Sequence, residues 1–217
     1  MTSFPKLLPA NRCGAPTIFL LTGLWLILIG FGSLTLFGFE TQPGAKGSAP
    51  GQWPARTSLA LHRTRPTLLL FAHPKCPCTR ATLGELALLM ASCQGKVSAV
   101  VLFTKPPGVS GEWVESGLWH DAQAIPNVSV VRDDEGVEAR RFGALTSGDT
   151  MLFSPEGKLL FHGGMTEERG HSGDNDGRSA LFTFIQHGSA RRVATPVYGC
   201  PLFGGRSEER KSASCPP

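Results

Sequence analysis

Residues 67–80 read Thr67-Leu68-Leu69-Leu70-Phe71-Ala72 and then His73-Pro74-Lys75-Cys76-Pro77-Cys78-Thr79-Arg80. The first six residues form a continuous apolar run, which predicts a buried strand. Two cysteines separated by one proline follow it, and a helical pattern begins directly after them. The sequence therefore places two thiols on a strand-to-helix turn. There the free N–H groups and the partial positive charge of the helix N-terminus favour the thiolate, the reactive form of cysteine. This pattern favours redox chemistry over a pair of buried or metal-binding cysteines.

A second feature is the uncharged apolar stretch Thr17–Phe39, which is long enough to cross a bilayer as a helix. A cleaved signal peptide has a shorter apolar region and a small-residue cleavage site, so we expect an uncleaved anchor. Lys6 and Arg12 precede the stretch and Glu40 follows it, which favours a cytoplasmic N-terminus and an exported body. The expected location is a bacterial-type inner membrane, crossed once, with the soluble part on the periplasmic side. A thiol pair can cycle through a disulfide there. The opposite topology remains an alternative.

These features divide the chain into five predicted parts. Residues 1–16 are a cytoplasmic segment and 17–39 the transmembrane anchor. Residues 40–56, rich in Gly, Pro, Ser and Ala, are expected to be a flexible linker. Residues 57–188 form one compact domain, and 189–217 a C-terminal tail that holds Cys200. The net charge of +4 is spread along the chain without a basic stripe, so no nucleic-acid partner is expected.

The predicted domain alternates strands and helices. Apolar runs predict strands at 67–72, 97–103 and 127–131, followed by a hairpin of 151–153 and 159–162 around a Pro/Gly turn. Helical spacing predicts helices at 83–93, 111–124, 135–142 and 178–186. Alternation implies parallel strands joined by crossover helices, and the hairpin adds antiparallel strands. The fold class is therefore α/β: a mixed sheet with helices on both faces, preceded by one transmembrane helix.

This order, with the cysteine pair at the first strand-helix junction, resembles the thioredoxin fold, especially the membrane-tethered TlpA/ResA-like redoxins. The match is closest to RedB-type redoxins, on His73-Pro74-Lys75-Cys76-Pro77-Cys78-Thr79-Arg80, Arg169-Gly170-His171-Ser172-Gly173-Asp174-Asn175 and Thr195-Pro196-Val197-Tyr198-Gly199-Cys200-Pro201-Leu202. The resemblance implies a thiol-disulfide oxidoreductase acting on protein thiols or disulfides, with an unidentified reductant and no cofactor. The chain departs from the usual thioredoxin pattern in its one-residue cysteine spacing and its lack of a tryptophan before the first cysteine. It also has Gly148-Asp149-Thr150 where a proline usually faces the active site.

The candidate catalytic residues are Cys76 and Cys78. Cys76 precedes the helix and is expected to be exposed, so we assign it as nucleophile. Cys78, near the first helical turn, would be the resolving thiol. A disulfide across one residue would be strained and easily reduced, so Cys76 has reason to use a distant partner. Cys200 is the possible third thiol, or an idle cysteine in the tail. Cys93 lies on an apolar helix face and is expected in the core.

Several polar residues are predicted to modulate the thiols. His73, Lys75 and Arg80 flank the pair and would lower the pKa of Cys76. Asp149 would face the cysteines in the inferred fold and act as a proton acceptor, and His171 would border the site. The cysteines at positions 13 and 215 lie near the two ends of the chain and are not assigned a role.

The main alternative is a metal site. His73, Cys76 and Cys78 offer three ligands within six residues, and His162 or His171 would supply a fourth. Thiolate and imidazole suit copper or zinc. In this alternative the chain would be an envelope metal-binding thiol protein, similar to membrane-tethered copper chaperones of the Sco type.

Overall fold

The computed structural model describes residues 15–204, so the cysteines at positions 13 and 215 lie outside it. Its first element is the helix α1, Ala15–Glu40, whose large apolar side chains are exposed. The stretch Pro16–Thr41 has a mean hydropathy of 2.1, which is apolar enough to cross a membrane. The predicted N-terminal apolar helix is therefore confirmed, and such a helix serves either as a signal sequence or as an anchor.

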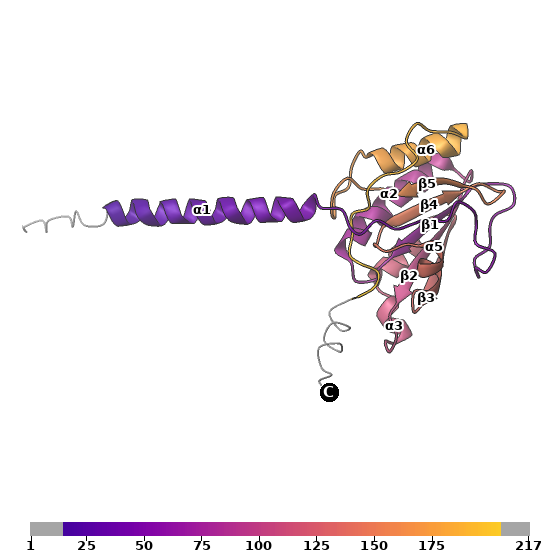
Figure 1. Ribbon diagram of the computed structural model, residues 1–217, viewed down its shortest axis with the longest axis horizontal. Helices are drawn as coiled ribbons and strands as arrows, with labels where there is room; N and C mark the ends of the chain where they lie inside the picture. The colour runs from indigo at the N-terminus through magenta and orange to yellow at the C-terminus, as the bar shows by residue number, and fades with distance from the viewer. Residues whose placement is uncertain (1–14, 205–217) are drawn as a thin grey trace, which may run out of the picture. The chain divides into compact units, whose positions relative to one another are not determined.

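The remainder is built on one mixed sheet of five strands in the order β3-β2-β1-β4-β5 (Figure 1). β1 is parallel to β2, and β2 is parallel to β3, whereas β4 runs antiparallel to both β1 and β5. The bounds are β1 Thr67–Ala72, β2 Ser98–Lys105, β3 Val128–Asp134, β4 Asp149–Phe153 and β5 Leu159–Gly163. The predicted combination of parallel strands and a late antiparallel hairpin is confirmed.

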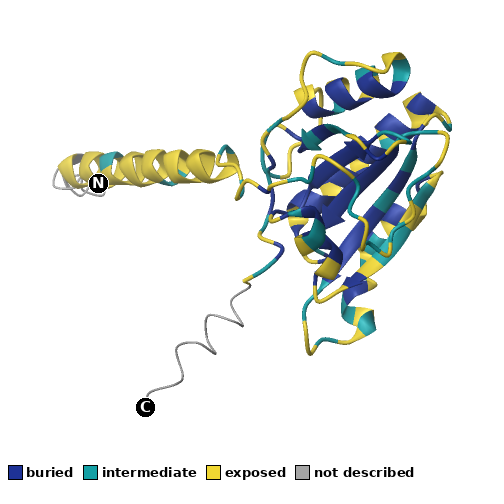
Figure 2. Cartoon of the chain, turned by 45° about the vertical axis from the view of Figure 1, so that its right-hand side comes forward, coloured by how far each residue is buried: buried dark blue, intermediate teal, exposed yellow. Residues whose placement is uncertain are grey.

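Helices cover both faces of this sheet, and the three central strands β2, β1 and β4 are largely buried (Figure 2). α2, α4 and α6 share one apolar core with Leu70, while α5 shares the opposite core with Phe71. Neighbouring residues of β1 enter different cores because side chains alternate along a strand. The bounds are α2 Pro77–Cys93, α3 Gly111–Val114, α4 Gly117–Gln123, α5 Val137–Phe142 and α6 Asp176–His187. The helix predicted at 111–124 is thus two short helices.

The segment expected to be a flexible linker instead lies along the domain. The backbone N–H of Gly44 donates to Val197 at 2.8 Å, and the N–H of Ser48 donates to Gly143 at 3.0 Å. Trp53 packs edge-on against two phenylalanine rings of the α5-side core, with ring centroids 5.2 and 5.1 Å away. A Cβ at Gly47 would collide with the carbonyl oxygen of Gly143. Glycines therefore allow close backbone docking here, although the composition suggests a free tether.

The chain after α6 also returns to the domain. We call residues 193–202 the C-terminal strap. The N–H of His162 donates to the carbonyl of Val193 at 3.0 Å, and the N–H of Leu202 donates to Leu145 at 2.9 Å. Val197 and Leu202 are buried. The strap therefore runs from β5 to the loop before β4, and it carries Cys200 back onto the folded domain.

Candidate functional site: a cluster of three thiols

Cys76 is the N-cap of α2, the residue that immediately precedes the helix. Its backbone is extended, with φ −88° and ψ 120°, and Pro77 occupies the first helical turn. Proline suits that place, because its missing N–H would have no partner within the helix and its φ is already helical. The backbone N–H groups of Cys78 and Thr79 approach the Cys76 sulfur and favour its thiolate. The turn predicted from the sequence therefore presents a thiol to a helix N-terminus.

Cys200 lies against Cys76 and is the group that most strongly favours its thiolate. The Cys200 thiol hydrogen-bonds to the Cys76 sulfur, and the Cys200 N–H also faces it. Together with the N–H groups at the start of α2, these donors outweigh burial and lower the pKa of Cys76 to about 4. The expectation of an exposed nucleophile was wrong, because only 1% of Cys76 is accessible.

Cys78 completes a thiol cluster, which we define as Cys76, Cys78 and Cys200. Burial raises the pKa of Cys78, and the nearby negative charge of Cys76 raises it further. The pKa of Cys200 is raised mainly because the Cys200 proton forms the hydrogen bond to the Cys76 thiolate. The cluster therefore holds one thiolate, at Cys76, beside two protonated thiols. Cys93 lies in the apolar core, as expected.

Arg169 is a site residue whose role the sequence analysis did not recognise. Its charge opposes the rise in the pKa of both Cys78 and Cys200. Its Nη1 donates to the carbonyl of Gly199 at 2.5 Å, and its Nε donates to the carbonyl of Gln42 at 3.2 Å. The only sequence signal was its place in one of the blocks quoted for the redoxin resemblance. Arg169 lies more than ninety positions after Cys76 in the chain, so no local sequence pattern links the two residues.

Ser147 is a second residue that the sequence analysis missed. Its Oγ accepts from the N–H of His73 at 2.9 Å and lies 2.9 Å from the Thr79 Oγ1. Its backbone N–H donates to the carbonyl of Cys200 at 2.8 Å. Ser147 therefore joins the cysteine turn to the C-terminal strap and fixes the two sides of the thiol cluster relative to each other.

The predicted modulators have different outcomes. His73 lies near Cys76, but burial is the main influence and lowers the pKa of the imidazole, so its neutral form is favoured. The Lys75 amine lies over the Trp113 ring, 5.6 Å from its centroid. Arg80 pairs instead with Asp121 at 3.3 Å, and both side chains are mostly exposed. His171 is exposed in the loop before α6, and Arg169 in the same loop is the residue whose charge acts on the thiols.

Asp149 does not face the cysteines, contrary to the prediction. It lies opposite Phe71 in the β1–β4 register, and alternation places its side chain on the face of Met151, in the core on the α5 side. There it pairs with His162, whose Nε2 lies 2.9 Å from Oδ1. Burial raises the pKa of Asp149, and the hydrogen bond to His162 opposes that rise. We call Asp149 and His162 the buried pair.

The predicted metal ligands are not assembled. His162 belongs to the buried pair on the far face of the sheet, so it cannot join His73, Cys76 and Cys78. Within residues 15–204, no group of three or more His, Cys, Asp or Glu side chains is arranged to hold a metal ion.

A shallow depression gives access to the cysteine turn. It has a volume of about 320 Å³ and is lined by Lys75, Cys76, Pro77 and Arg80 from the turn and by Ser116, Gly117 and Leu118 from the start of α4, together with Pro74. Neither Cys78 nor Cys200 belongs to this lining. The depression therefore reaches Cys76 from a side that the other two thiols do not occupy.

No family model and no curated protein matches the chain. Among solved structures, it is similar to an uncharacterized conserved protein from Geobacillus kaustophilus. The TM-score is 0.54, the identity 14%, and the match covers 76% of this chain and 94% of that one. It is also similar to a hypothetical protein from Sinorhizobium meliloti 1021, with a TM-score of 0.53, 18% identity and coverage of 76% and 96%.

A more distant match, with a TM-score of 0.40 and 15% identity, is a secreted disulfide oxidoreductase from Mycobacterium tuberculosis described as homologous to Escherichia coli DsbE. It covers 56% of this chain and 81% of that one. Identities at this level speak for the fold alone. With its mixed sheet, its crossover helices and its late hairpin, the chain has a thioredoxin-like fold.

Proposed function

We propose that the chain is a membrane-anchored thiol-disulfide oxidoreductase of the cell envelope, in which Cys76 is the nucleophile. The observation that carries the proposal is the position of Cys76 at the N-terminus of α2, next to Cys78 and Cys200. Hydrogen-bond donors from Cys78, Thr79 and Cys200 surround it and lower the pKa of Cys76 to about 4. A thiolate is the species that attacks disulfides, so such a group is ready to react at neutral pH.

The reaction begins when a disulfide of a partner protein enters the depression beside Cys76. The Cys76 thiolate attacks one partner sulfur, an S–S bond forms between them, and the other partner sulfur leaves as a thiolate that takes a proton from water. A second thiol of this chain then attacks Cys76 and releases the partner fully reduced. Cys78 and Cys200 are the two candidates for this step, because both contact Cys76. The reverse sequence oxidises a partner dithiol.

The proposal is tested with the full chain in detergent micelles, reduced and then mixed with glutathione disulfide. Mass spectrometry should find glutathione on Cys76 before any other site, and two glutathione thiols should be released per chain. Cys76→Ser should abolish both results, whereas Cys93→Ser, at a buried cysteine outside the cluster, should leave the adduct unchanged. Equal labelling of the wild type and Cys76→Ser would overturn the proposed function.

The predicted location is tested separately by topology. A reporter that is active only outside the cytoplasm, fused after Pro217, should be active in a bacterial host, because Lys6 and Arg12 favour a cytoplasmic N-terminus. A fusion without residues 1–40 should lose that activity. Activity only from a reporter that requires the cytoplasm would contradict the proposed location.

A further inference from the structure

We propose that Cys200, carried by the C-terminal strap, is the thiol that resolves the mixed disulfide on Cys76, and that Arg169 positions it. This inference rests on the proposed function and names the second reacting residue. In the resulting cycle the oxidised chain holds a Cys76–Cys200 disulfide, and Cys78 stays reduced.

The strap is built to hold Cys200 at this place. Ser147 donates its backbone N–H to the Cys200 carbonyl, and Arg169 donates to the neighbouring Gly199 carbonyl. Pro201 forms an antiparallel bridge with Thr146. A Cβ at Gly199 would collide with the carbonyl oxygen of Ser147, so the close approach requires glycine there. A cysteine in an idle tail would need none of these contacts.

The geometry around Cys76 suits an exchange in which the partner sulfur approaches from one side and the resolving thiol from the other. Thiol-disulfide exchange passes through three sulfurs in a line, so the resolving thiol must attack away from the leaving partner. The partner sulfur arrives through the depression beside α4, whose lining excludes Cys200. Cys200 already hydrogen-bonds to Cys76, and forming the bond brings the two sulfurs to about 2 Å.

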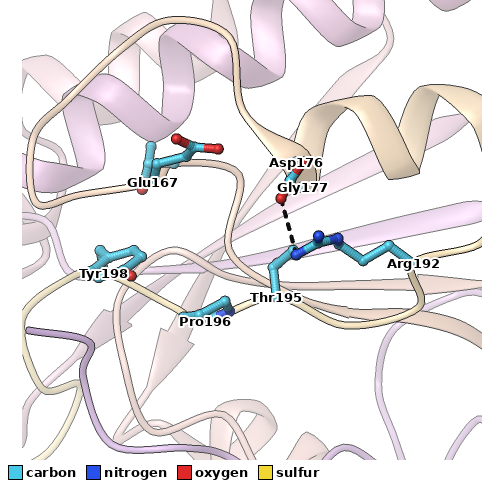
Figure 3. Close-up of a pocket in the computed structure, with 8 residues that line it drawn as sticks. Glu167, Asp176, Gly177, Arg192, Thr195, Pro196 and Tyr198 are labelled. Atoms are coloured by element: carbon cyan, nitrogen blue, oxygen red, sulfur yellow. Dashed lines mark ion pairs between the residues drawn. The ribbon is translucent and has the colours of Figure 1, made fainter. Parts of the chain in front are cut away.

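The strap borders two cavities, and its backbone is hydrogen-bonded to the domain between them. Figure 3 shows Thr195, Pro196 and Tyr198 of the strap facing Asp176 and Gly177 at the start of α6, across a cavity of about 260 Å³. A second cavity, of about 300 Å³, lies beside Thr195 and Pro196 and is also lined by Pro43 and Lys46 of the docked segment. Backbone hydrogen bonds to His162, Gly164 and Gly44 hold the middle of the strap in place. Forming the bond therefore requires rotation of the Cys200 side chain rather than movement of the strap.

Cys78 is less suited to the resolving step. It lies in the first turn of α2, one proline away from Cys76, and a disulfide across a single residue would be strained. Burial is the main reason that the pKa of Cys78 is high, and burial persists when Cys76 reacts. The pKa of Cys200 is high mainly because its thiol hydrogen-bonds to the Cys76 thiolate. That thiolate disappears in the mixed disulfide, so the largest influence that raises the pKa of Cys200 is removed at the moment when the Cys200 thiolate is needed.

The step balances without another reactant. Cys200 gives its proton to water, and its thiolate attacks the Cys76 sulfur. The Cys76–partner bond breaks, and the partner sulfur leaves as a thiolate that is then protonated. Over both steps Cys76 and Cys200 lose two electrons, and the partner disulfide gains them. The Arg169 guanidinium stabilises the transient Cys200 thiolate because it lies close enough to oppose the rise in that thiol's pKa.

The experiment uses the full chain in micelles, glutathione disulfide as the probe, and Cys200→Ser with Cys78→Ser as its matched control. Cys200→Ser should retain glutathione on Cys76 and release the second glutathione on the order of 100-fold more slowly, because it loses an intramolecular nucleophile. Cys78→Ser should still release the second glutathione, and peptide mapping should find Cys76 linked to Cys200. Cys93→Ser, outside the cluster, should release both glutathiones at close to the wild-type rate.

Two other outcomes would lead to different conclusions, one about the resolving thiol and one about the proposed function. If Cys78→Ser retains glutathione while Cys200→Ser releases it normally, the resolving role belongs to Cys78 and the inference is wrong, although the proposed function stands. If no variant forms an adduct on Cys76, the proposed function itself fails.

Discussion

The thiol cluster lies at the N-terminus of α2 and the buried pair on the α5 side of the sheet, and each holds an ionisable group that is almost fully buried. Burial opposes ionisation at Cys76 and at Asp149 alike. At Cys76, thiol and backbone donors outweigh burial, and the thiolate persists. At Asp149, burial outweighs the hydrogen bonds from His162 and Thr150, and the pKa is raised. Burial alone therefore does not set the direction of a pKa shift, because hydrogen-bond donors can outweigh it.

The largest expected effect removes the thiolate itself. Cys76→Ser should abolish exchange with glutathione disulfide and should remove a thiolate absorbance that titrates near pH 4 in the reduced wild type. The lowered pKa also stabilises the fold above the unfolded value of about 8.5, and this stabilisation is lost as the pH falls toward the folded value. The melting temperature of the wild type should therefore fall relative to that of Cys76→Ser as the pH is lowered from 8 to 5.

Cys200→Ala is the companion variant to this titration. Because Cys200 is the largest influence on the Cys76 thiolate, its loss should move the absorbance titration to higher pH. A titration that disappears in Cys78→Ala and persists in Cys76→Ser would show that the thiolate is at Cys78.

The next effect weakens the strap without removing a thiol. Gly199→Ala introduces a methyl group against the Ser147 carbonyl and should cost about 1–3 kcal/mol of stability through overpacking. The strap should shift, and the pKa of Cys76 should rise because the Cys200 donor moves away. Thermal melting and the thiolate titration measure the two results. Gly51→Ala, where a Cβ meets open space, is the matched control. If Gly199→Ala is destabilised but its titration is unchanged, the position of the strap does not influence the pKa of Cys76.

A smaller effect tests the guanidinium. Arg169→Ala should slow the release of glutathione from Cys76 about tenfold, because it removes the cation that opposes the rise in the pKa of Cys200. Arg169→Lys keeps the positive charge and should recover part of that rate, which a purely structural role would not predict. Arg192→Ala removes an exposed ion pair of 3.0 Å with Asp176 and serves as control. Equal rates for the alanine and lysine variants would show that charge is not the contribution.

The smallest effect concerns the buried pair. The folded state holds the Asp149 proton more tightly than the unfolded state, so the wild type loses relative stability as the pH rises above about 4. Asp149→Asn cannot ionise, so its melting temperature should rise relative to that of the wild type as the pH increases over that range. The corresponding change in the free energy of unfolding should be about 1 kcal/mol or less. The exposed control Asp121→Asn should show no such trend. If instead the melting temperature of Asp149→Asn falls relative to that of the wild type as the pH rises, His162 stabilises the ionised carboxylate.

The sequence predicted the parts of the fold that depend on local patterns. The strand at 67–72 and the cysteine turn follow from an apolar run, a proline and two cysteines, and the structure has them where they were expected. The same patterns could not show that Cys76 is buried, because its cover comes from Cys200 on a distant strap. They also placed Asp149 on the wrong face, since the face depends on the β1–β4 register rather than on its neighbours in the chain. Docking of the Gly-rich segment depends on close backbone approach, which composition does not reveal.

The two possible disulfides would affect the fold very differently. A Cys76–Cys78 bond would close a ring of three residues and restrict the unfolded chain very little. A Cys76–Cys200 bond would close a loop that contains every strand from β2 to β5, and long loops are restricted most. By the thermodynamic cycle that joins unfolding to reduction, any stability that this bond adds to the fold must equally resist the reductant. A partner that resets the chain would therefore also soften its structure, so the redox state and the rigidity of the domain would change together.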